Sequence, residues 1–193
     1  MNTLIGKKAP FFQAQAVENG KIDDNFSLER FLGKYVVLFF YPLDFTFVCP
    51  TELHAFNESI DAFSKRNTQV LACSVDSVYC HDAWLKTSKS QGGIAGLRYP
   101  LVSDINKSIS RQYGVLNEEQ GIAYRGLFLI DREGFVRHLL VNDLPLGRSV
   151  EEALRMVDAL THFEQHGEVC PANWSSGHKS FEPSPEGVLS YFN

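Results

Sequence analysis

The sequence predicts an α/β protein in which a central mixed sheet carries helices on both faces, followed by an extension of different composition. Strand-like and helix-like segments alternate along most of the chain, which is typical of this class. Hydrophobic residues make up 44% of the 193 residues, and 15 residues are Phe, so the chain has enough apolar surface for a large core. From Glu168 onward the composition shifts to Pro, Ser and Gly, and the regular apolar spacing ends.

The first half of the chain predicts three strands and three helices. The run YVVLFFYP is apolar throughout and rich in β-branched and aromatic residues, which indicates a strand buried on both faces, and QVLACSVD indicates the same. In the segment between these strands, apolar residues recur at helical spacing, at Leu53, Phe56, Ile60 and Phe63. The expected elements are a strand at 11–17, a short helix at 27–33, a strand at 35–42, a helix at 50–67, a strand at 69–76 and a helix at 78–90.

The second half predicts a short helix around KSISRQYG, then a hairpin and a long helix. Strands at 123–131 and 135–143 flank the tripeptide REG, which is typical of a tight turn. The long helix spans 149–167, with Ser149 as the expected N-cap and Glu152 at the capping-box position. A mixed sheet with helices on both faces follows from this order of elements.

This order also resembles the thioredoxin fold with an N-terminal β extension. The resemblance implies one domain over residues 1–167. The remaining residues, 168–193, form a C-terminal extension that carries a cysteine and several aromatic residues.

Composition and charge exclude several classes of protein. The net charge is −5 and no basic block is present, so nucleic-acid binding has no electrostatic support. The segment MNTLIGKKAPFF lacks the apolar run of a secretory signal, and YVVLFFYPL is too short to span a bilayer. We therefore expect a soluble, cytoplasmic protein without membrane association.

Four cysteines are spread along the chain without a C-x-x-C motif: Cys49, Cys73, Cys80 and Cys170. Paired ligands at zinc-site spacing are missing, since only Cys80 has a neighbouring histidine, and adjacent side chains rarely bind one ion. We expect no metal, and redox or structural roles for the thiols. Cys73 lies in an expected buried strand, and Cys80 is expected to be a surface or packing residue.

Cys49 stands where a buried strand gives way to a helix. Pro50 favours the first helical position, which makes Cys49 the N-cap, although Thr46 is an alternative cap. In either case the sulfur lies in or beside the first turn, where free N–H groups and the helix dipole favour a thiolate, the nucleophilic form. Glu52, in the same turn, is expected to help cap the helix or to hold an arginine.

The segment YPLDFTFVCPTE resembles the active-site segment of the peroxiredoxins, whose signature P-x-x-x-T-x-x-C is filled here by Pro42, Thr46 and Cys49. The family has an arginine on a later strand beside the thiolate, and YRGLFLID supplies Arg125. HGEVCPANW resembles the resolving-cysteine motif of the typical two-cysteine subgroup and marks Cys170. The resemblance extends from Lys7 to the end of the chain.

The resemblance implies a thiol peroxidase that acts on hydrogen peroxide and organic hydroperoxides and needs no cofactor. Cys49 would attack the peroxide, Arg125 would stabilise the negative charges, Thr46 would orient the substrate and Pro42 would shield the pocket. The sulfenic acid at Cys49 would condense with Cys170 of the partner subunit in a head-to-tail homodimer. Thioredoxin or a flavoprotein disulfide reductase would recycle the disulfide, and five dimers would form a ring.

Three further expectations follow. Arg148 is a candidate second arginine near the site. Because a cysteine in a helix turn and one in a distant tail seldom stand at bonding distance, we expect the active-site turn to unwind and the tail to detach in each cycle. The ending SYFN resembles that of peroxiredoxins sensitive to overoxidation, in which a C-terminal helix covers the active-site turn. Intermediate sensitivity is expected because the partner loop is one residue longer than the usual G-G-x-G; the residues concerned are Gly92, Gly93, Gly96, Tyr191 and Phe192.

Two alternatives remain open from the residues alone. A disulfide oxidoreductase or chaperone-like protein of thioredoxin architecture would bind client proteins instead of peroxides, but such an oxidoreductase is expected to carry C-x-x-C at the helix start. Arg125 on a buried strand is also compatible with a purely structural salt bridge.

Overall fold

A computed structural model describes residues 3–193 of the chain. The chain forms two compact units, Met1–Val150 and Glu151–Asn193. The first unit contains the sheet, and the second contains the last long helix together with the tail.

The first unit is built on a mixed sheet, as the sequence predicts, and the sheet has seven strands. In spatial order the strands are β2 (Lys21–Ser27), β1 (Gln13–Glu18), β5 (Leu101–Ser103), β4 (Thr68–Ser74), β3 (Tyr35–Phe40), β8 (Arg125–Ile130) and β9 (Val136–Asn142). The central strands β3, β4 and β5 are parallel, and the flanking pairs are antiparallel. Strands β3 and β8 are buried at every position, which explains why their sequences are largely apolar without alternation.

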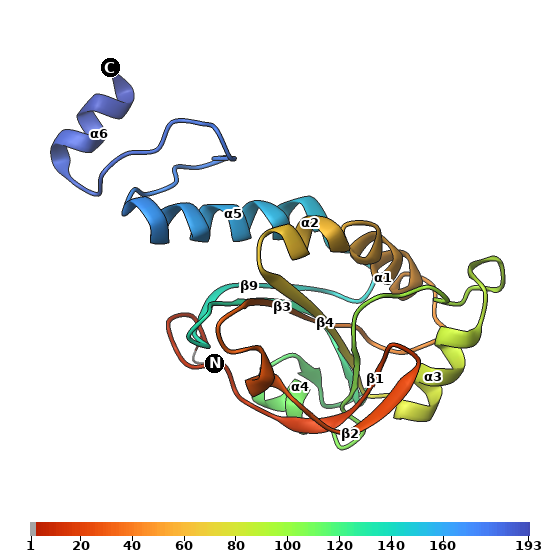
Figure 1. Cartoon of the computed structure of the whole chain (residues 1–193). Coiled ribbons are helices and arrows are strands. Elements are labelled where there is room, and N and C mark those ends of the chain that lie inside the picture. The colour runs from red at the N-terminus through yellow and green to blue at the C-terminus, as the bar shows by residue number, and fades with distance from the viewer. Residues whose placement is uncertain (1–2) are drawn as a thin grey trace. The chain divides into compact units, whose positions relative to one another are not determined.

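Helices cover both faces of this sheet (Figure 1). The helices of the first unit are α1 (Cys49–Glu58), α2 (Ile60–Lys65), α3 (Val78–Lys86) and α4 (Ser108–Gln112), with short 3₁₀ turns at Leu28–Phe31 and Lys89–Gln91. A small separate hairpin pairs β6 (Leu116–Asn117) with β7 (Ile122–Ala123). The second unit holds α5 (Val150–His166), whose first residue ends the first unit, and α6 (Pro185–Phe192).

Neighbouring residues of β3 show the two faces directly. Phe39 stacks on Phe56 of α1, with ring centroids 4.4 Å apart. Phe40 points the other way and contacts Tyr113, which follows α4, at 5.3 Å. Since successive side chains of a strand point to opposite faces, α1 and α4 lie on opposite sides of β3. This arrangement is the thioredoxin fold, with the β1–β2 hairpin as the N-terminal extension.

Four local expectations need correction. Strand β2 was not predicted, because its sequence KIDDNFS is mostly polar at an edge of the sheet and shows no apolar alternation. The expected helix at 50–67 is two helices, since Ser59, at φ −96° and ψ 4°, leaves helical geometry. The expected helix at 78–90 ends at Lys86, and a short 3₁₀ turn follows. The N-cap of α1 is Val48, so Cys49 is the first helical residue instead of the cap.

The second unit is held together by hydrogen bonds between α5 and the tail. Arg155 donates to the carbonyl of Trp174 at 2.9 Å, and Cys170 Sγ lies 3.6 Å from the carbonyl of Ala159. These bonds explain why the compact units divide near the start of α5. The functional boundary expected between residues 167 and 168 is a different division and stays a prediction.

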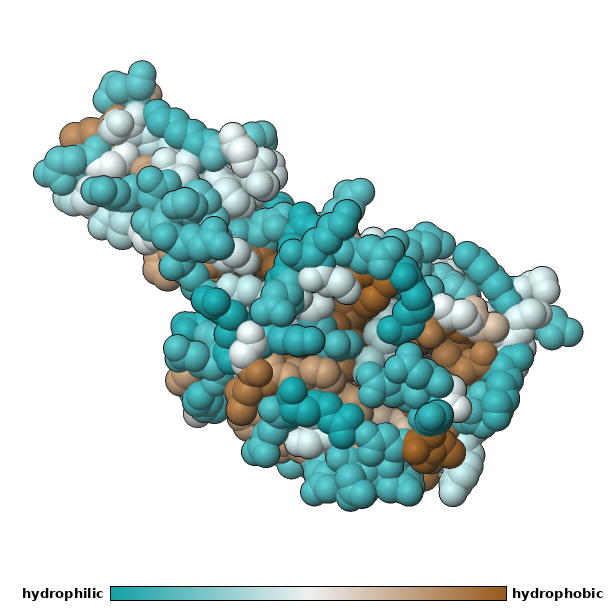
Figure 2. All heavy atoms as spheres, in the orientation of Figure 1, coloured by the Kyte–Doolittle hydropathy of each residue, from teal (hydrophilic) through white to brown (hydrophobic). Residues whose placement is uncertain are grey.

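The visible surface is mostly hydrophilic, with apolar patches among the polar side chains (Figure 2). Phe47 and Tyr79 are among the exposed large apolar residues, at 92% and 70% exposure. Within residues 3–193, none of the helices combines the length and apolar character needed to cross a bilayer.

Candidate active site

The thiol of Cys49 is buried at the start of α1. Its residue is 0% exposed, and its backbone opens the first turn, directly after Val48. Pro50, as the second helical residue, costs no hydrogen bond there. The sulfur therefore lies where the helix presents its free N–H groups and its positive dipole end.

Thr46 is in contact with the sulfur. Its Oγ1 lies 3.0 Å from Cys49 Sγ and 2.8 Å from the carbonyl oxygen of Leu43. A hydroxyl has one hydrogen, so Thr46 donates either to the carbonyl or to a thiolate. Phe45 before it adopts φ +55°, an unusual conformation for a bulky residue, and this places the hydroxyl over the helix start.

Arg125 reaches the sulfur from strand β8. Its Nη1 lies 3.5 Å from Cys49 Sγ and 2.6 Å from Glu52 Oε2, and its Nε donates to the carbonyl of Leu144 at 2.6 Å. The arginine is 3% exposed, so these interactions take place away from water. Arg125 therefore makes both the structural salt bridge to Glu52 and the contact with the Cys49 sulfur, because its Nη1 takes part in both.

Arg148 completes a buried ionic cluster with Glu52. Its Nε and Nη2 bind the two oxygens of Glu52 at 2.7 and 2.8 Å, and its backbone N–H donates to Oε1 at 2.9 Å. Its Nη1 donates to the carbonyls of Phe40 and Gly126 at 2.6 and 2.7 Å, which ties it to β3 and β8. Glu52 thus holds two arginines, one of which touches Cys49.

The charges of this cluster do not cancel. Two guanidinium groups, of Arg125 and Arg148, surround the single carboxylate of Glu52, and all three residues are buried. One positive charge remains in excess beside the Cys49 sulfur. Because an uncompensated buried charge is costly, the cluster favours an anion at that position, and a thiolate provides it.

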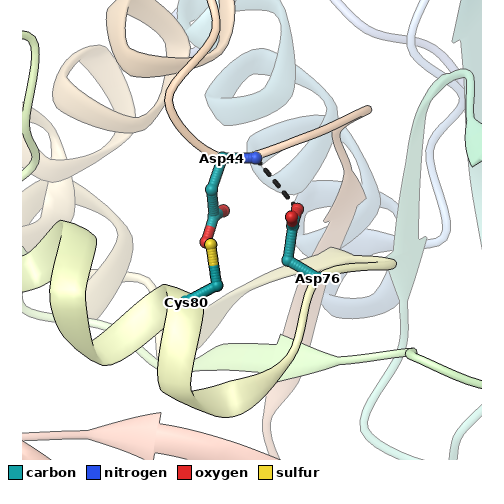
Figure 3. A group of neighbouring side chains, drawn as sticks. All are labelled: Asp44, Asp76 and Cys80. Atoms are coloured by element: carbon teal, nitrogen blue, oxygen red, sulfur yellow. Dashed lines mark hydrogen bonds between the residues drawn. The ribbon is translucent and has the colours of Figure 1, made fainter.

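A second buried network fixes the loop before Thr46. Asp44 accepts a hydrogen bond from the Tyr41 hydroxyl at 2.7 Å, and its other oxygen lies 2.7 Å from His81 Nδ1. The Asp44 backbone N–H donates to Asp76 at 2.9 Å, shown as the dashed line in Figure 3. This network was not predicted from the sequence. His81 is 0% exposed and pairs with a residue 37 positions away, so no local pattern reveals it.

Cys80 points at the same two carboxylates, as Figure 3 shows. The ligand atoms of Asp44, Asp76 and Cys80 lie within 4.8 Å of one another. The carboxylate oxygens already accept hydrogen bonds, including one from Ser74 to Asp76 at 2.7 Å. Burial, with Asp44 and Asp76 nearby, raises the pKa of the Cys80 thiol to about 12. The thiol therefore stays protonated at neutral pH.

The remaining predicted residues of the first unit lie around this centre. Pro42 is buried two residues after the end of β3, and Cys73 is fully buried in β4. In the glycine loop, a side chain at Gly93 would collide with the Thr87 carbonyl, at 2.0 Å. His54 of α1 binds the carbonyl of Gly93 at 3.0 Å, and a pocket of about 380 Å³ lies between this loop and the first turns of α1. The loop is thereby attached to the helix that begins at Cys49.

Cys170 and the residues at the chain end belong to the second unit. Cys170 is partly buried, and burial is the main cause that raises the pKa of its thiol. Tyr191 lies in α6 and contacts Phe181 at 5.0 Å, whereas Phe192 is 80% exposed. All four cysteines are free thiols in this structure.

Comparisons with known proteins agree with this fold and site. The AhpC/TSA family matches residues 5–139, and the C-terminal domain of 1-Cys peroxiredoxin matches residues 159–193. A thioredoxin peroxidase of Echinococcus granulosus is 54% identical over 193 residues, covering 100% of both chains. Peroxiredoxin-2 of Mus musculus is 51% identical, covering 100% of this chain and 96% of the relative.

Solved structures give the same result. The reduced 2-Cys peroxiredoxin of Plasmodium vivax has a TM-score of 0.95 and 52% identity, with 99% of each chain covered. AhpC of Enterococcus faecalis has a TM-score of 0.82 and 37% identity, covering 88% of this chain and 100% of that one. The chain therefore belongs to the AhpC/TSA family, as a peroxiredoxin of the two-cysteine kind.

Proposed function

We propose that this protein is a thiol peroxidase that reduces hydrogen peroxide and organic hydroperoxides, with Cys49 as the attacking group. The observation that carries the proposal is the contact of Arg125 with both Cys49 Sγ and Glu52, inside a buried cluster with one excess positive charge. Relatives of more than 50% identity are named thioredoxin peroxidase or peroxiredoxin.

In the first step, the Cys49 thiolate attacks the terminal oxygen of the peroxide. The O–O bond breaks, an S–O bond forms, and the sulfur is oxidised to sulfenic acid while the leaving alkoxide or hydroxide takes up a proton. Arg125 stabilises the negative charge on the departing oxygen, and the Thr46 hydroxyl orients the substrate. Pro42, buried beside the strand end, keeps bulk water from the pocket.

In the second step, the sulfenic acid condenses with the thiol of Cys170 of the partner subunit. An S–S bond forms and water leaves. Because Cys49 is 0% exposed, its turn has to unwind before another thiol can reach it, as the sequence analysis expects. Thioredoxin or a flavoprotein disulfide reductase then supplies two electrons as a dithiol and restores both thiols.

The working unit is a homodimer, and rings of five dimers are the larger assembly. Strand β9 supports the dimer because it lies at an edge of the sheet, where a strand is able to pair with a second copy. The exposure of Phe47 and Tyr79 supports further association. A cytoplasmic location is proposed as well, and the four free thiols support it because a reducing compartment preserves them.

Sensitivity to overoxidation is proposed to be intermediate. The longer glycine loop at residues 92–96 and the ending with Tyr191 and Phe192 motivate this proposal. Titration with peroxide during turnover should yield sulfinic acid on Cys49 only at high excess. Its complete lack at any excess, measured by mass spectrometry, would contradict the proposal.

The test of the function is a non-reducing gel with a mass spectrum after one equivalent of hydrogen peroxide. Wild type should form a disulfide-linked dimer, whereas Cys49→Ser and Cys170→Ser should not, and Cys170→Ser should retain a sulfenic acid on Cys49. Cys73→Ser and Cys80→Ser are matched controls that should behave as wild type. Unchanged peroxide consumption by Cys49→Ser would refute the function, and a disulfide in Cys170→Ser would refute the pairing alone.

A further inference from the structure

The tail holds a hydrogen-bonded chain of three side chains that the reaction above does not use. The hydroxyl of Ser180 donates to Glu168 Oε2, and His162 Nε2 lies 2.9 Å from that hydroxyl and 3.4 Å from the same carboxylate oxygen. The single hydroxyl hydrogen goes to the carboxylate, so His162 Nε2–H is the donor to Ser180. The three residues join α5, the start of the tail and a distant part of the tail.

This chain of side chains lies beside Cys170. Val169, between Glu168 and Cys170, exchanges two backbone hydrogen bonds with Phe181, at 2.8 and 3.4 Å. The thiol itself contacts the carbonyl of Ala159 on α5. The Ser180 side chain and the Phe181 backbone therefore bind residues 168–169, the segment directly before Cys170.

The other side of Cys170 is fixed as well. Trp174 is 3% exposed, its carbonyl accepts from Arg155, and its indole N–H donates to the carbonyl of His178 at 3.1 Å. The ring of His162 lies 4.9 Å from the Trp174 ring. Cys170 thus lies in a segment attached to α5 at both ends, with His162 contacting both attachments.

The same part of the tail is attached to α6. Lys179 Nζ donates to the carbonyls of Ser190 and Tyr191, at 2.6 and 3.2 Å, and Phe181 contacts the Tyr191 ring. Residues 179–181 consequently bind the segment before Cys170 on one side and helix α6 on the other.

We propose that Glu168, Ser180 and His162 form a clasp that holds Cys170 against α5 and sets how often its thiol is released for disulfide formation. The proposal rests on the proposed function of Cys170. A tighter clasp slows disulfide formation and so lengthens the lifetime of the Cys49 sulfenic acid. A second peroxide molecule then has time to transfer one oxygen atom to the sulfur, which becomes sulfinic acid, and the peroxide leaves as alcohol or water. The three residues act as positioning residues, since they act on Cys170 through the tail segment that carries it.

The carboxylate is the strongest part of the clasp. The Ser180 hydroxyl, followed by His162, lowers the pKa of Glu168. The groups that surround His162 are Glu168, Ser180, Trp174 and the ring of His166, whose centroid lies 4.6 Å away on α5. Ionised Glu168 thus remains an acceptor throughout the neutral pH range.

The test measures how fast iodoacetamide alkylates Cys170 in the fully reduced protein, with each cysteine followed by mass spectrometry. Ser180→Ala and His162→Phe should raise the Cys170 rate roughly three- to tenfold, the effect of one lost hydrogen bond on an opening equilibrium. Ser180→Thr keeps the hydroxyl and should restore the wild-type rate. Ser175→Ala is the matched control, because its hydroxyl contacts the His178 ring outside the clasp.

A second readout is the ratio of Cys49–Cys170 disulfide to Cys49 sulfinic acid at fixed peroxide excess, which should rise in Ser180→Ala by a similar factor. An unchanged alkylation rate in both variants overturns the clasp. Faster alkylation with an unchanged ratio overturns its control of the reaction. Faster alkylation in a protein whose wild type forms no Cys49–Cys170 disulfide upholds the clasp and refutes the proposed function of Cys170.

Discussion

Arg148 binds Glu52 through three donors, two from its guanidinium and one from its own backbone N–H, at 2.7 to 2.9 Å. The carboxylate of Glu52 is therefore fixed in position and leaves one oxygen oriented toward Arg125, 2.6 Å away. Arg125 in turn touches the sulfur. Glu52, in the first turn of α1, thus orients the guanidinium group of Arg125 beside Cys49.

Replacing Glu52 by Gln should destabilise the protein strongly. The change removes the one carboxylate between two buried guanidinium groups, and breaking a buried ion pair costs about 3 kcal/mol or more. Urea unfolding of Glu52→Gln should report this loss. Glu58→Gln, at a pair with Lys89 in which both side chains are mostly exposed, should shift stability by less than about 0.5 kcal/mol. Equal effects in the two variants would contradict the role of the cluster.

Replacing Arg125 by Gln should slow the reaction with peroxide about 100-fold, because a preorganised positive group beside the reacting atoms is lost. Stopped-flow measurement of the oxidation rate checks this. Arg137→Gln on β9 removes a partly exposed arginine paired with Asp131 and is the control. A rate for Arg125→Gln within twofold of wild type would leave the arginine with a structural function alone.

Thr46→Val should lower the peroxide rate about tenfold or more, since the methyl group keeps the volume but removes the hydroxyl at 3.0 Å from the sulfur. Thr46→Ser should recover most of the activity. If Val and Ser behave alike in a steady-state assay over a range of peroxide concentrations, the hydroxyl is not needed to orient the substrate.

Cys80 should react slowly with iodoacetamide, and its rate should keep rising above pH 10. The pKa of its thiol is raised from 9.0 to about 12, so the thiolate is scarce until strongly alkaline pH. In the unfolded chain, the rate should be half-maximal near pH 9 and level off about one pH unit higher. Since the folded state retains the proton longer, this thiol's contribution to stability is present below pH 9 and is lost as the pH rises toward 12. A half-maximal rate near pH 9 in the folded protein would contradict the carboxylate contacts.

Much of the centre could be predicted from the sequence because the information is local. The apolar run of β3, Pro50 after Cys49, and the threonine three residues earlier together place a thiol at a helix start. The arginine on β8 came from the family resemblance, since nothing in the run RGLFLI indicates which partner Arg125 has.

The remaining features depend on distant contacts. The sequence marked Arg148 as a candidate near the site, but not its bonds to carbonyls of β3 and β8, because backbone acceptors leave no trace in the sequence. His81 and Asp44 were missed for a similar reason, because a buried pair 37 residues apart has no spacing rule. Strand β2 was missed because its pairing with β1, not its composition, makes it a strand.

The excess positive charge beside Cys49 has a consequence for the timing of each turnover. The closed turn is stabilised while the sulfur is an anion, because the anion balances the one guanidinium charge that Glu52 leaves over. Once the sulfur has gained an oxygen and is neutral, that excess charge has no counter-charge, and the closed form loses this support. Oxidation of Cys49 to sulfenic acid should therefore loosen the turn, and this loosening exposes Cys49 to the second thiol.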